Sequence, residues 1–303
     1  MPNFSFTNNK ESDIIKLGGR KMKIAISAES TIDLTPSLLK EYDIKVLPYK
    51  IILGKDEFTD GEDVNPEKIF NFVKENKVLP KTTAINEYEY GEFFEGLLKE
   101  YDAVVHFCLS SAISSACSHA VEASKKLDNV FVVDTKSLST GIALLAMDAR
   151  KLAEQGKTAE QIYKRETERV ASVQASFVIK KLDYLYKGGR CSALSLFGAN
   201  LLQIRPQIIL KPDGAMGVHR KYMGNMDKVI EKYCKDTLAE FNTPDLDTAF
   251  VTYTTATPAM VETAKKALQE RGFKNIYETT AGGTITSHCG EFTLGILYLN
   301  DGK

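Results

Sequence analysis

The sequence of 303 residues contains no long hydrophobic run and no excess of charge of either sign. No apolar segment approaches the roughly 18 residues that a membrane-spanning helix requires, so no transmembrane segment is predicted. The 39 basic and 40 acidic residues give a net charge of −1, which offers no electrostatic reason to bind nucleic acid. Residues 1–21 lack the apolar core of a secretory signal, and we expect a poorly ordered extension there, with the folded unit starting near Met22.

Cysteine and histidine are few and scattered. The five cysteines form no CxxC pair, and an odd, dispersed set is not a disulfide framework, which predicts reduced thiols in a cytoplasmic protein. The four histidines show no spacing typical of a metal site, so no metal is predicted.

Glycine-rich phosphate loops are also missing. No GxGxxG follows the first strand-like run, and no GxxxxGK[ST] occurs, so no nucleotide cofactor is predicted. A GxSxG nucleophile elbow is absent as well. The glycines of "KGGR" (187–190) and "AGG" (281–283) are interpreted as helix ends or tight turns.

Short β-rich runs alternate with helical patterns along the chain, which predicts an α/β fold with mostly parallel sheet. We expect an N-terminal lobe over 22–173 and a C-terminal lobe over 174–303. A hairpin is predicted over 205–220, around the turn Pro212-Asp213-Gly214, and it indicates a mixed sheet in the second lobe.

Serine and threonine follow several of the predicted strands. A strand at 77–80 would lead into "KTTAIN", and the run "AVVHFC" leads into "LSSAISSA" (109–116). One hydroxyl at a helix start is an ordinary cap. Four serines exceed that need, and hydroxyls beside free helix N–H groups can bind a carboxylate or phosphate. Because ligands of open α/β sheets bind beyond the carboxyl ends of the strands, these loops are the candidate site.

Two further residues have open interpretations. His288 is either a core or surface residue or part of the site, and the adjacent Cys289 is badly placed to be activated by it. Arg220, after the hairpin, is either a solvated charge or the partner of an anion.

Seven segments, in order and spacing, resemble the DegV family of bacterial fatty-acid-binding proteins. The resemblance covers nearly the whole chain from Met22, and its landmarks are "AESTIDL", "KTTAIN", "LSSAISSACSHA", "VVDTKSLSTG", "YLYKGGRCSAL", "RPQIILKPDG" and "SHCGE". It implies two α/β lobes, the first with a parallel sheet and the second with a smaller mixed sheet, and a long-chain fatty acid in an apolar tunnel between them. It also implies a separate fatty acid kinase, which converts the presented acid into an acyl phosphate for phospholipid synthesis, and is compatible with peripheral membrane contact.

The resemblance also implies the site residues. The carboxylate-binding positions fall on Thr82 and Ser114, the family's C-terminal histidine on His288 and its arginine after the hairpin on Arg220. Neighbouring hydroxyls are expected in supporting positions, namely those of Ser30, Thr83, Ser110 and Ser111. Three segments depart from the family pattern: Glu29-Ser30-Thr31, Ser114-Ser115-Ala116-Cys117 and Gly290-Glu291-Phe292.

The predicted function is therefore fatty-acid binding and presentation, without catalysis, metal or cofactor in this chain. Two hydroxyl donors would hold the carboxylate without a buried ion pair. His288 is expected to titrate near neutral pH and tune that charge. Two alternatives remain open at this point: a serine- and histidine-dependent hydrolase or transferase, and a scaffold whose hydroxyls only cap helices.

Overall fold

The computed structural model describes residues 22–191 and 204–302. The predicted extension over 1–21 lies outside the described residues. The first sheet has four parallel strands in the order β2-β1-β6-β7, as expected: β1 (Ile24–Glu29), β2 (Ile44–Leu47), β6 (Ala103–Cys108) and β7 (Val130–Asp134). All six positions of β1 and of β6 are buried, which is typical of parallel strands covered on both faces.

Five described helices of this half of the chain accompany the first sheet: α1 (Pro36–Glu41), α3 (Glu87–Leu98), α4 (Ala116–Ser124), α5 (Thr140–Glu154) and α6 (Ala159–Arg169). Local signals set their starts. Asn86 and Glu89 form a capping box at α3, and Thr158 and Gln161 form another at α6. Helix α4 begins later than the predicted start near residue 113, so all four serines of "LSSAISSA" precede it.

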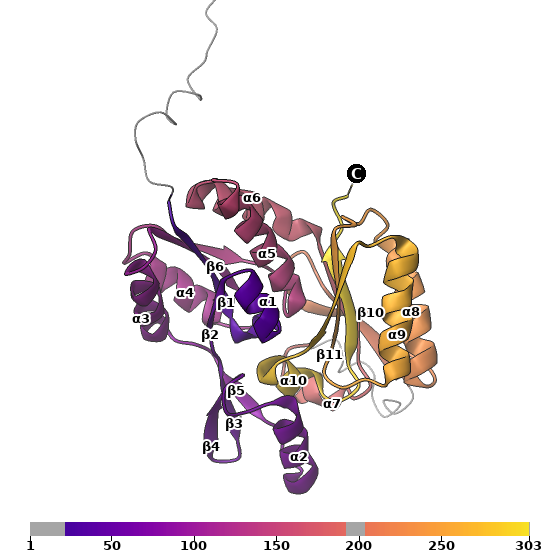
Figure 1. The fold of residues 1–303 in the computed structure, drawn as a ribbon. Helices are drawn as coiled ribbons and strands as arrows, with labels where there is room; N and C mark the ends of the chain where they lie inside the picture. The colour runs from indigo at the N-terminus through magenta and orange to yellow at the C-terminus, as the bar shows by residue number, and fades with distance from the viewer. Residues whose placement is uncertain (1–21, 192–203, 303) are drawn as a thin grey trace, which may run out of the picture.

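A small antiparallel sheet projects from one end of this half, beside α2 (Pro66–Asn76), as Figure 1 shows. Its strand order is β4-β3-β5, with β3 (Lys50–Leu53), β4 (Asp56–Thr59) and β5 (Lys81–Thr83). The predicted strand at 77–80 is wrong. Lys77 ends α2 in a left-handed conformation (φ 57), and the strand is Lys81–Thr83 itself, because these residues pair with β3.

The second sheet is mixed, as predicted, with strand order β10-β9-β8-β13-β11-β12. Only β11 and β12 pair in parallel. With six described strands against four, it is not the smaller sheet, because the predicted hairpin and four further strands all join it. Its strands are β8 (Val173–Val178), β9 (Ile204–Leu210), β10 (Met216–Met223), β11 (Thr248–Tyr253), β12 (Asn275–Thr280) and β13 (Leu294–Leu299).

Four helices accompany the second sheet: α7 (Asp183–Lys187), α8 (Met226–Glu240), α9 (Pro258–Arg271) and α10 (Gly283–Cys289). Gly188 caps the end of α7, as the interpretation of "KGGR" requires. The interpretation of "AGG" as a helix end or turn is wrong, because Gly282 and Gly283 begin α10. This helix contacts β3, β5 and α2 of the first half as well as α7.

Helix α5 connects the two sheets. It packs on β1 and β6 of the first sheet and on β8, β11 and β13 of the second, while α8 and α9 cover the far face of the second sheet (Figure 1). One hydrophobic core therefore runs through α5 and includes Val105 and Phe250 from the two sheets. The division into lobes at 173/174 stays a prediction. Among the described helices, none is long and apolar enough to cross a membrane.

Candidate functional site

One cavity gathers predicted site residues from distant parts of the chain. Its volume is about 90 Å³. Its polar lining comes from Tyr49 between β2 and β3, Thr82 of β5, Ser114 and Ser115 before α4, Arg190 after α7 and His288 of α10. A larger hollow of about 520 Å³ lies on the surface beside α2 and β4, but none of the predicted site residues lines it.

Thr82 enters the cavity because of its position in β5. Side chains alternate along a strand, and here Thr82 is half-buried while Thr83 is exposed. The Thr82 Oγ1 atom lies 2.8 Å from Nε2 of His288, which brings together two residues predicted for the site. Thr83 pairs with Lys50 in the sheet and does not line the cavity, so its predicted supporting role has no basis in the structure.

Ser114 is held by a residue that the sequence did not indicate. Its Oγ atom lies 3.1 Å from the Tyr49 hydroxyl and accepts a hydrogen bond from the Ala116 N–H. Tyr49 is itself buried, and its N–H donates to Ser30 Oγ, which donates in turn to Asp60. Ser30 therefore contacts the cavity wall through Tyr49.

The other two predicted serines have structural partners elsewhere. The buried Ser110 hydroxyl donates to the Gly214 carbonyl, at the turn of the β9–β10 hairpin, and so ties the two halves of the chain together. Ser111 is exposed and accepts from Lys136 Nζ at 2.8 Å. Neither residue lines the cavity. Of the four serines, Ser114 and Ser115 therefore line the cavity, while Ser110 and Ser111 make contacts between loops.

Burial determines the charge of His288. Burial and the nearby Arg190 guanidinium lower the pKa of its imidazole to about 4. The expectation that His288 titrates near neutral pH is therefore wrong, since the ring is uncharged there. Its Nδ1 atom has no hydrogen-bond partner among the described residues. This atom lies close to Gly188, where an added Cβ atom would be 2.8 Å from Nδ1.

Helix α10, which carries His288, is anchored by two carboxylates from the first half of the chain. Asp60 accepts from the Gly283 and Thr284 N–H groups, and Asp33 accepts from the Gly282 N–H. These bonds satisfy the free N–H groups at the helix start. Burial also raises the pKa of Asp33 to about 8, although hydrogen bonds from Ser139 and Gly282 oppose the shift.

Arg220 is not part of the cavity. It lies on β10, where its guanidinium pairs with Glu240 at 2.7 Å and with Asp236 at 3.5 Å on α8. The reason is the register of the hairpin, which directs this exposed side chain towards α8. Among the described residues, the cation that lines the cavity is Arg190, which follows the second glycine of "KGGR".

The other side of the cavity is apolar. A second, narrow cavity of about 20 Å³ adjoins it and shares three lining residues with it, Leu138, Ile285 and Cys289. Phe177 and Leu297 of the second sheet line its far end. A polar end formed by hydroxyls thus lies next to a separate, narrow apolar passage between α10 and the second sheet.

Among the described residues, the cavity lacks the group that would orient a catalytic histidine. His288 bonds to Thr82, and among the described residues no carboxylate orients its Nδ1. Burial raises the pKa of the Cys289 thiol to about 12, so it is not a ready nucleophile. The side chains that could hold a metal ion together lie outside this cavity, in the first sheet.

Comparisons with known proteins agree with this architecture. The sequence profile described as "Uncharacterised protein, DegV family" matches residues 23–301. A fatty acid-binding protein of Thermotoga maritima is 34% identical over 226 residues, covering 71% of this chain and 78% of that protein.

Solved structures extend the similarity to the whole fold. A DegV family protein from Thermus thermophilus, described by its fatty acid binding, has a TM-score of 0.84 at 25% identity and covers 92% of this chain and 100% of its own. A DegV lipid binding protein from Thermotoga maritima has a TM-score of 0.79 at 30% identity, with 93% and 100% covered. The chain therefore belongs to the DegV family.

Proposed function

We propose that this protein binds a long-chain fatty acid, with the carboxylate at Thr82 and Ser114 and the acyl chain in the apolar passage. The observation that carries the proposal is the cavity itself. Two hydroxyls from distant segments line its polar end, and the passage beside Leu138 and Ile285 leads away from them. The names of the relatives point to the same class of ligand.

The hydrogen bond between Thr82 and His288 prepares the threonine to bind an anion. An uncharged imidazole has one N–H, and Nε2 faces Thr82 Oγ1 at 2.8 Å. If the proton is on Nε2, the threonine oxygen accepts it and the threonine O–H is free to donate to a carboxylate. Tyr49 acts in the same way on Ser114. Arg190 supplies positive charge at the cavity without a role in either bond.

The acyl chain supplies most of the binding energy. At roughly 0.8 kcal/mol for each buried methylene, a chain of about 14–16 carbons contributes on the order of 10 kcal/mol before ordering costs. Typical ligand pockets measure roughly 300–1,000 Å³, and the two cavities measure about 90 and 20 Å³. Binding must therefore separate the side chains shared by the two cavities, those of Leu138, Ile285 and Cys289.

The bound acid would be presented to a separate fatty acid kinase, in the cytoplasm, with the acyl phosphate entering phospholipid synthesis. Neutral hydroxyl donors leave the carboxylate oxygen more nucleophilic than a salt bridge would. The protein supplies no catalytic group of its own in this scheme. Loaded protein with ATP alone should form no acyl phosphate; its formation without a second protein would contradict a pure binding role.

The alternative of a serine- and histidine-dependent hydrolase has weaker support. Catalysis of that kind needs a base within hydrogen-bond reach of the nucleophile and a group that orients the base. His288 bonds to Thr82, and Ser114 bonds to Tyr49. Hydrolysis of acyl esters by the purified protein alone would favour this alternative.

The binding proposal is tested by native mass spectrometry of the purified full chain, followed by identification of any released acid and by palmitate titration. Each hydrogen bond to a charged group contributes about 1.5–3 kcal/mol. The double variant Thr82→Ala, Ser114→Ala should therefore bind palmitate at least about 100-fold more weakly. The matched control is Thr83→Ala, Ser111→Ala, which removes two neighbouring hydroxyls outside the cavity. Equal affinity of the two double variants would show that the head group lies elsewhere.

A further inference from the structure

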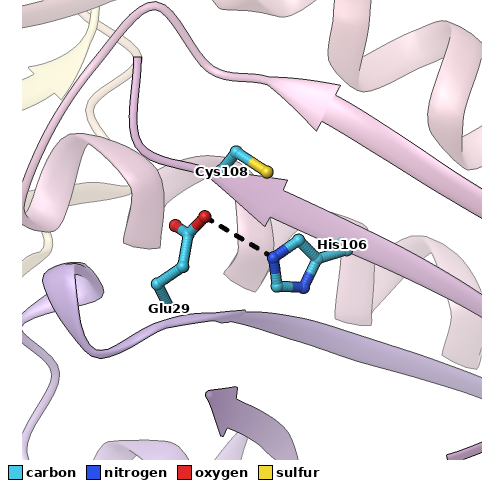
Figure 2. Close-up of side chains that lie close together, drawn as sticks. All are labelled: Glu29, His106 and Cys108. Atoms are coloured by element: carbon cyan, nitrogen blue, oxygen red, sulfur yellow. Dashed lines mark ion pairs between the residues drawn. The ribbon is translucent and has the colours of Figure 1, made fainter. Parts of the chain in front are cut away.

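A second group of buried polar side chains lies in the first sheet, on the face covered by α3. Glu29 is the last residue of β1, and His106 and Cys108 are on the neighbouring strand β6. The parallel register pairs Ser27 with His106, so alternation directs Ser27, Glu29, His106 and Cys108 to one face. Figure 2 shows Glu29, His106 and Cys108 converging. One ligand atom of each lies within 4.8 Å of the others, and all three residues are fully buried.

The imidazole of His106 is only half satisfied. Its Nδ1 atom lies 2.9 Å from Ser27 Oγ, while the buried Nε2 atom has no hydrogen-bond partner. Nε2 faces Glu29 Oε1 at 3.7 Å, as the dashed line in Figure 2 marks, which is too long for a hydrogen bond. Aromatic rings of α3 enclose the imidazole edge-on, those of Tyr90, Phe93 and Phe94. A buried nitrogen without a partner is costly and calls for an explanation.

The buried carboxylate of Glu29 lacks a positively charged partner among the described residues. Its carboxylate accepts from the Tyr90 hydroxyl at 2.7 Å and from the Leu109 N–H at 2.8 Å. Among the contacts of the described residues, Glu29 meets no lysine or arginine; its one possible cationic neighbour is His106. A buried carboxylate is costly to leave without a counter-charge. A cation between Oε1 and Nε2 would satisfy both groups at once.

We propose that Glu29, His106 and Cys108 bind a divalent transition-metal ion, with Zn²⁺ the best match. Carboxylate oxygen, imidazole nitrogen and thiolate sulfur are the three ligand types of protein zinc sites. Cys108 binds as the thiolate, and its proton passes to solvent. One carboxylate, one thiolate and one dication then sum to zero, which limits the cost of burial.

The surrounding contacts suit such a role. A histidine ligand commonly donates its other N–H to a partner that fixes the ring, and Ser27 is placed to accept from Nδ1. Glu29 and Cys108 also end their strands, directly before Ser30 and before "LSSAISSA". A metal ion here would fix the starting points of two loops, one that lines the cavity and one that contacts its wall through Tyr49. The site is buried, so the ion would be structural rather than catalytic.

The test uses the full chain without a histidine tag, stripped with a chelator and titrated with Co²⁺ as a spectroscopic probe for Zn²⁺. We expect one equivalent to bind with a thiolate-to-cobalt charge-transfer band and with tetrahedral d–d bands. Zn²⁺ should displace Co²⁺ and raise the melting temperature. Wild-type protein without a stoichiometric sulfur-ligated ion would overturn the proposal, whatever the variants do.

Variants assign the ligands. Cys108→Ala should abolish the charge-transfer band, whereas Cys234→Ala, which removes another buried free thiol, in α8, should keep it. Glu29→Gln preserves the acceptor for the Leu109 N–H and should weaken Co²⁺ binding at least about 100-fold. Ser27→Ala should weaken Co²⁺ binding about 10- to 100-fold, because the imidazole ring of His106 loses the partner that fixes its orientation.

Circular dichroism establishes that each variant is folded. Unchanged Co²⁺ binding in folded Cys108→Ala and Glu29→Gln would overturn the proposal. Palmitate binding is measured separately, so a failure of the fatty-acid proposal would leave the metal-binding proposal unaffected.

Discussion

Replacing Asp33 with asparagine should change how the stability of the protein depends on pH. Asp33 is buried at the junction between the two halves of the chain, where it contacts Ser139 and the N–H of Gly282 at the start of α10. Its pKa is raised from 3.8 to about 8 by burial. Between about pH 4 and pH 8 the folded state therefore keeps a proton that the unfolded chain has lost, so the free energy of unfolding falls as the pH rises.

The size of the effect follows from the two pKa values. Each pH unit in this range changes the stability by up to about 1.4 kcal/mol. From pH 5 to pH 8, with half-ionisation near pH 8, Asp33 should lower the free energy of unfolding by about 3–4 kcal/mol. Asparagine resembles the protonated acid in shape, and it tolerates the left-handed backbone at this position (φ 54). The variant should match the wild type at pH 5 and exceed it at pH 8.

Urea unfolding of both proteins from pH 5 to pH 8 measures this difference directly. Comparing the two proteins cancels the contribution of Glu166, whose pKa burial raises to about 9. Asp43→Asn is the matched control, because Asp43 also has a left-handed backbone (φ 43) but lies near the surface beside Lys45. A stability difference between Asp33→Asn and wild type that does not change with pH would mean that Asp33 is ionised throughout, and would refute the reasoning.

Two further perturbations test the packing between the sheets and the acyl passage. Arg169→Gln should lower the free energy of unfolding, measured in urea, by about 3–5 kcal/mol, because it leaves the carboxylates of Asp148, Asp245 and Asp301 without their buried cation. The control Arg220→Gln breaks an exposed pair and should change this free energy by no more than about 1 kcal/mol. Equal losses in the two variants would contradict the distinction between a buried and an exposed cation. Ile285→Trp should fill the passage and weaken palmitate binding at least about 10-fold while leaving octanoate binding unchanged. The control Ile276→Trp lies outside both cavities and should affect the binding of neither acid. Equal weakening of both acids by Ile285→Trp would show that the substitution does not act on the acyl chain.

Much of the secondary structure could be predicted from the sequence because its signals are local. Asn65 and Pro66 start α2, Asn86 starts α3, and the turn at Gly214 closes the β9–β10 hairpin, each where capping and turn chemistry place it. The alternation of strands and helices gave the α/β class, and the predicted hairpin gave the mixed character of the second sheet. The family followed from landmarks in order along the chain, and the comparisons confirm it.

Helix α10 could not be predicted, because its stability does not come from its own residues. The segment "GTITSHC" combines glycine with β-branched residues and serine, which are weak helix formers. It forms because Asp60 and Asp33, 223 and 249 residues away along the chain, accept the N–H groups at its start. The helix in turn decides where His288 lies.

The sequence by itself determined most of the elements, the family and the hydroxyl-rich loops, since these depend on neighbouring residues. Only the tertiary structure decided which hydroxyls meet: Thr82 faces the cavity and Thr83 does not, because of strand alternation and the pairing of β5 with β3. It also replaced Arg220 by Arg190 as the cavity's cation and brought His288 to Thr82 across 206 residues. Such contacts depend on how distant segments pack, and no local pattern records them.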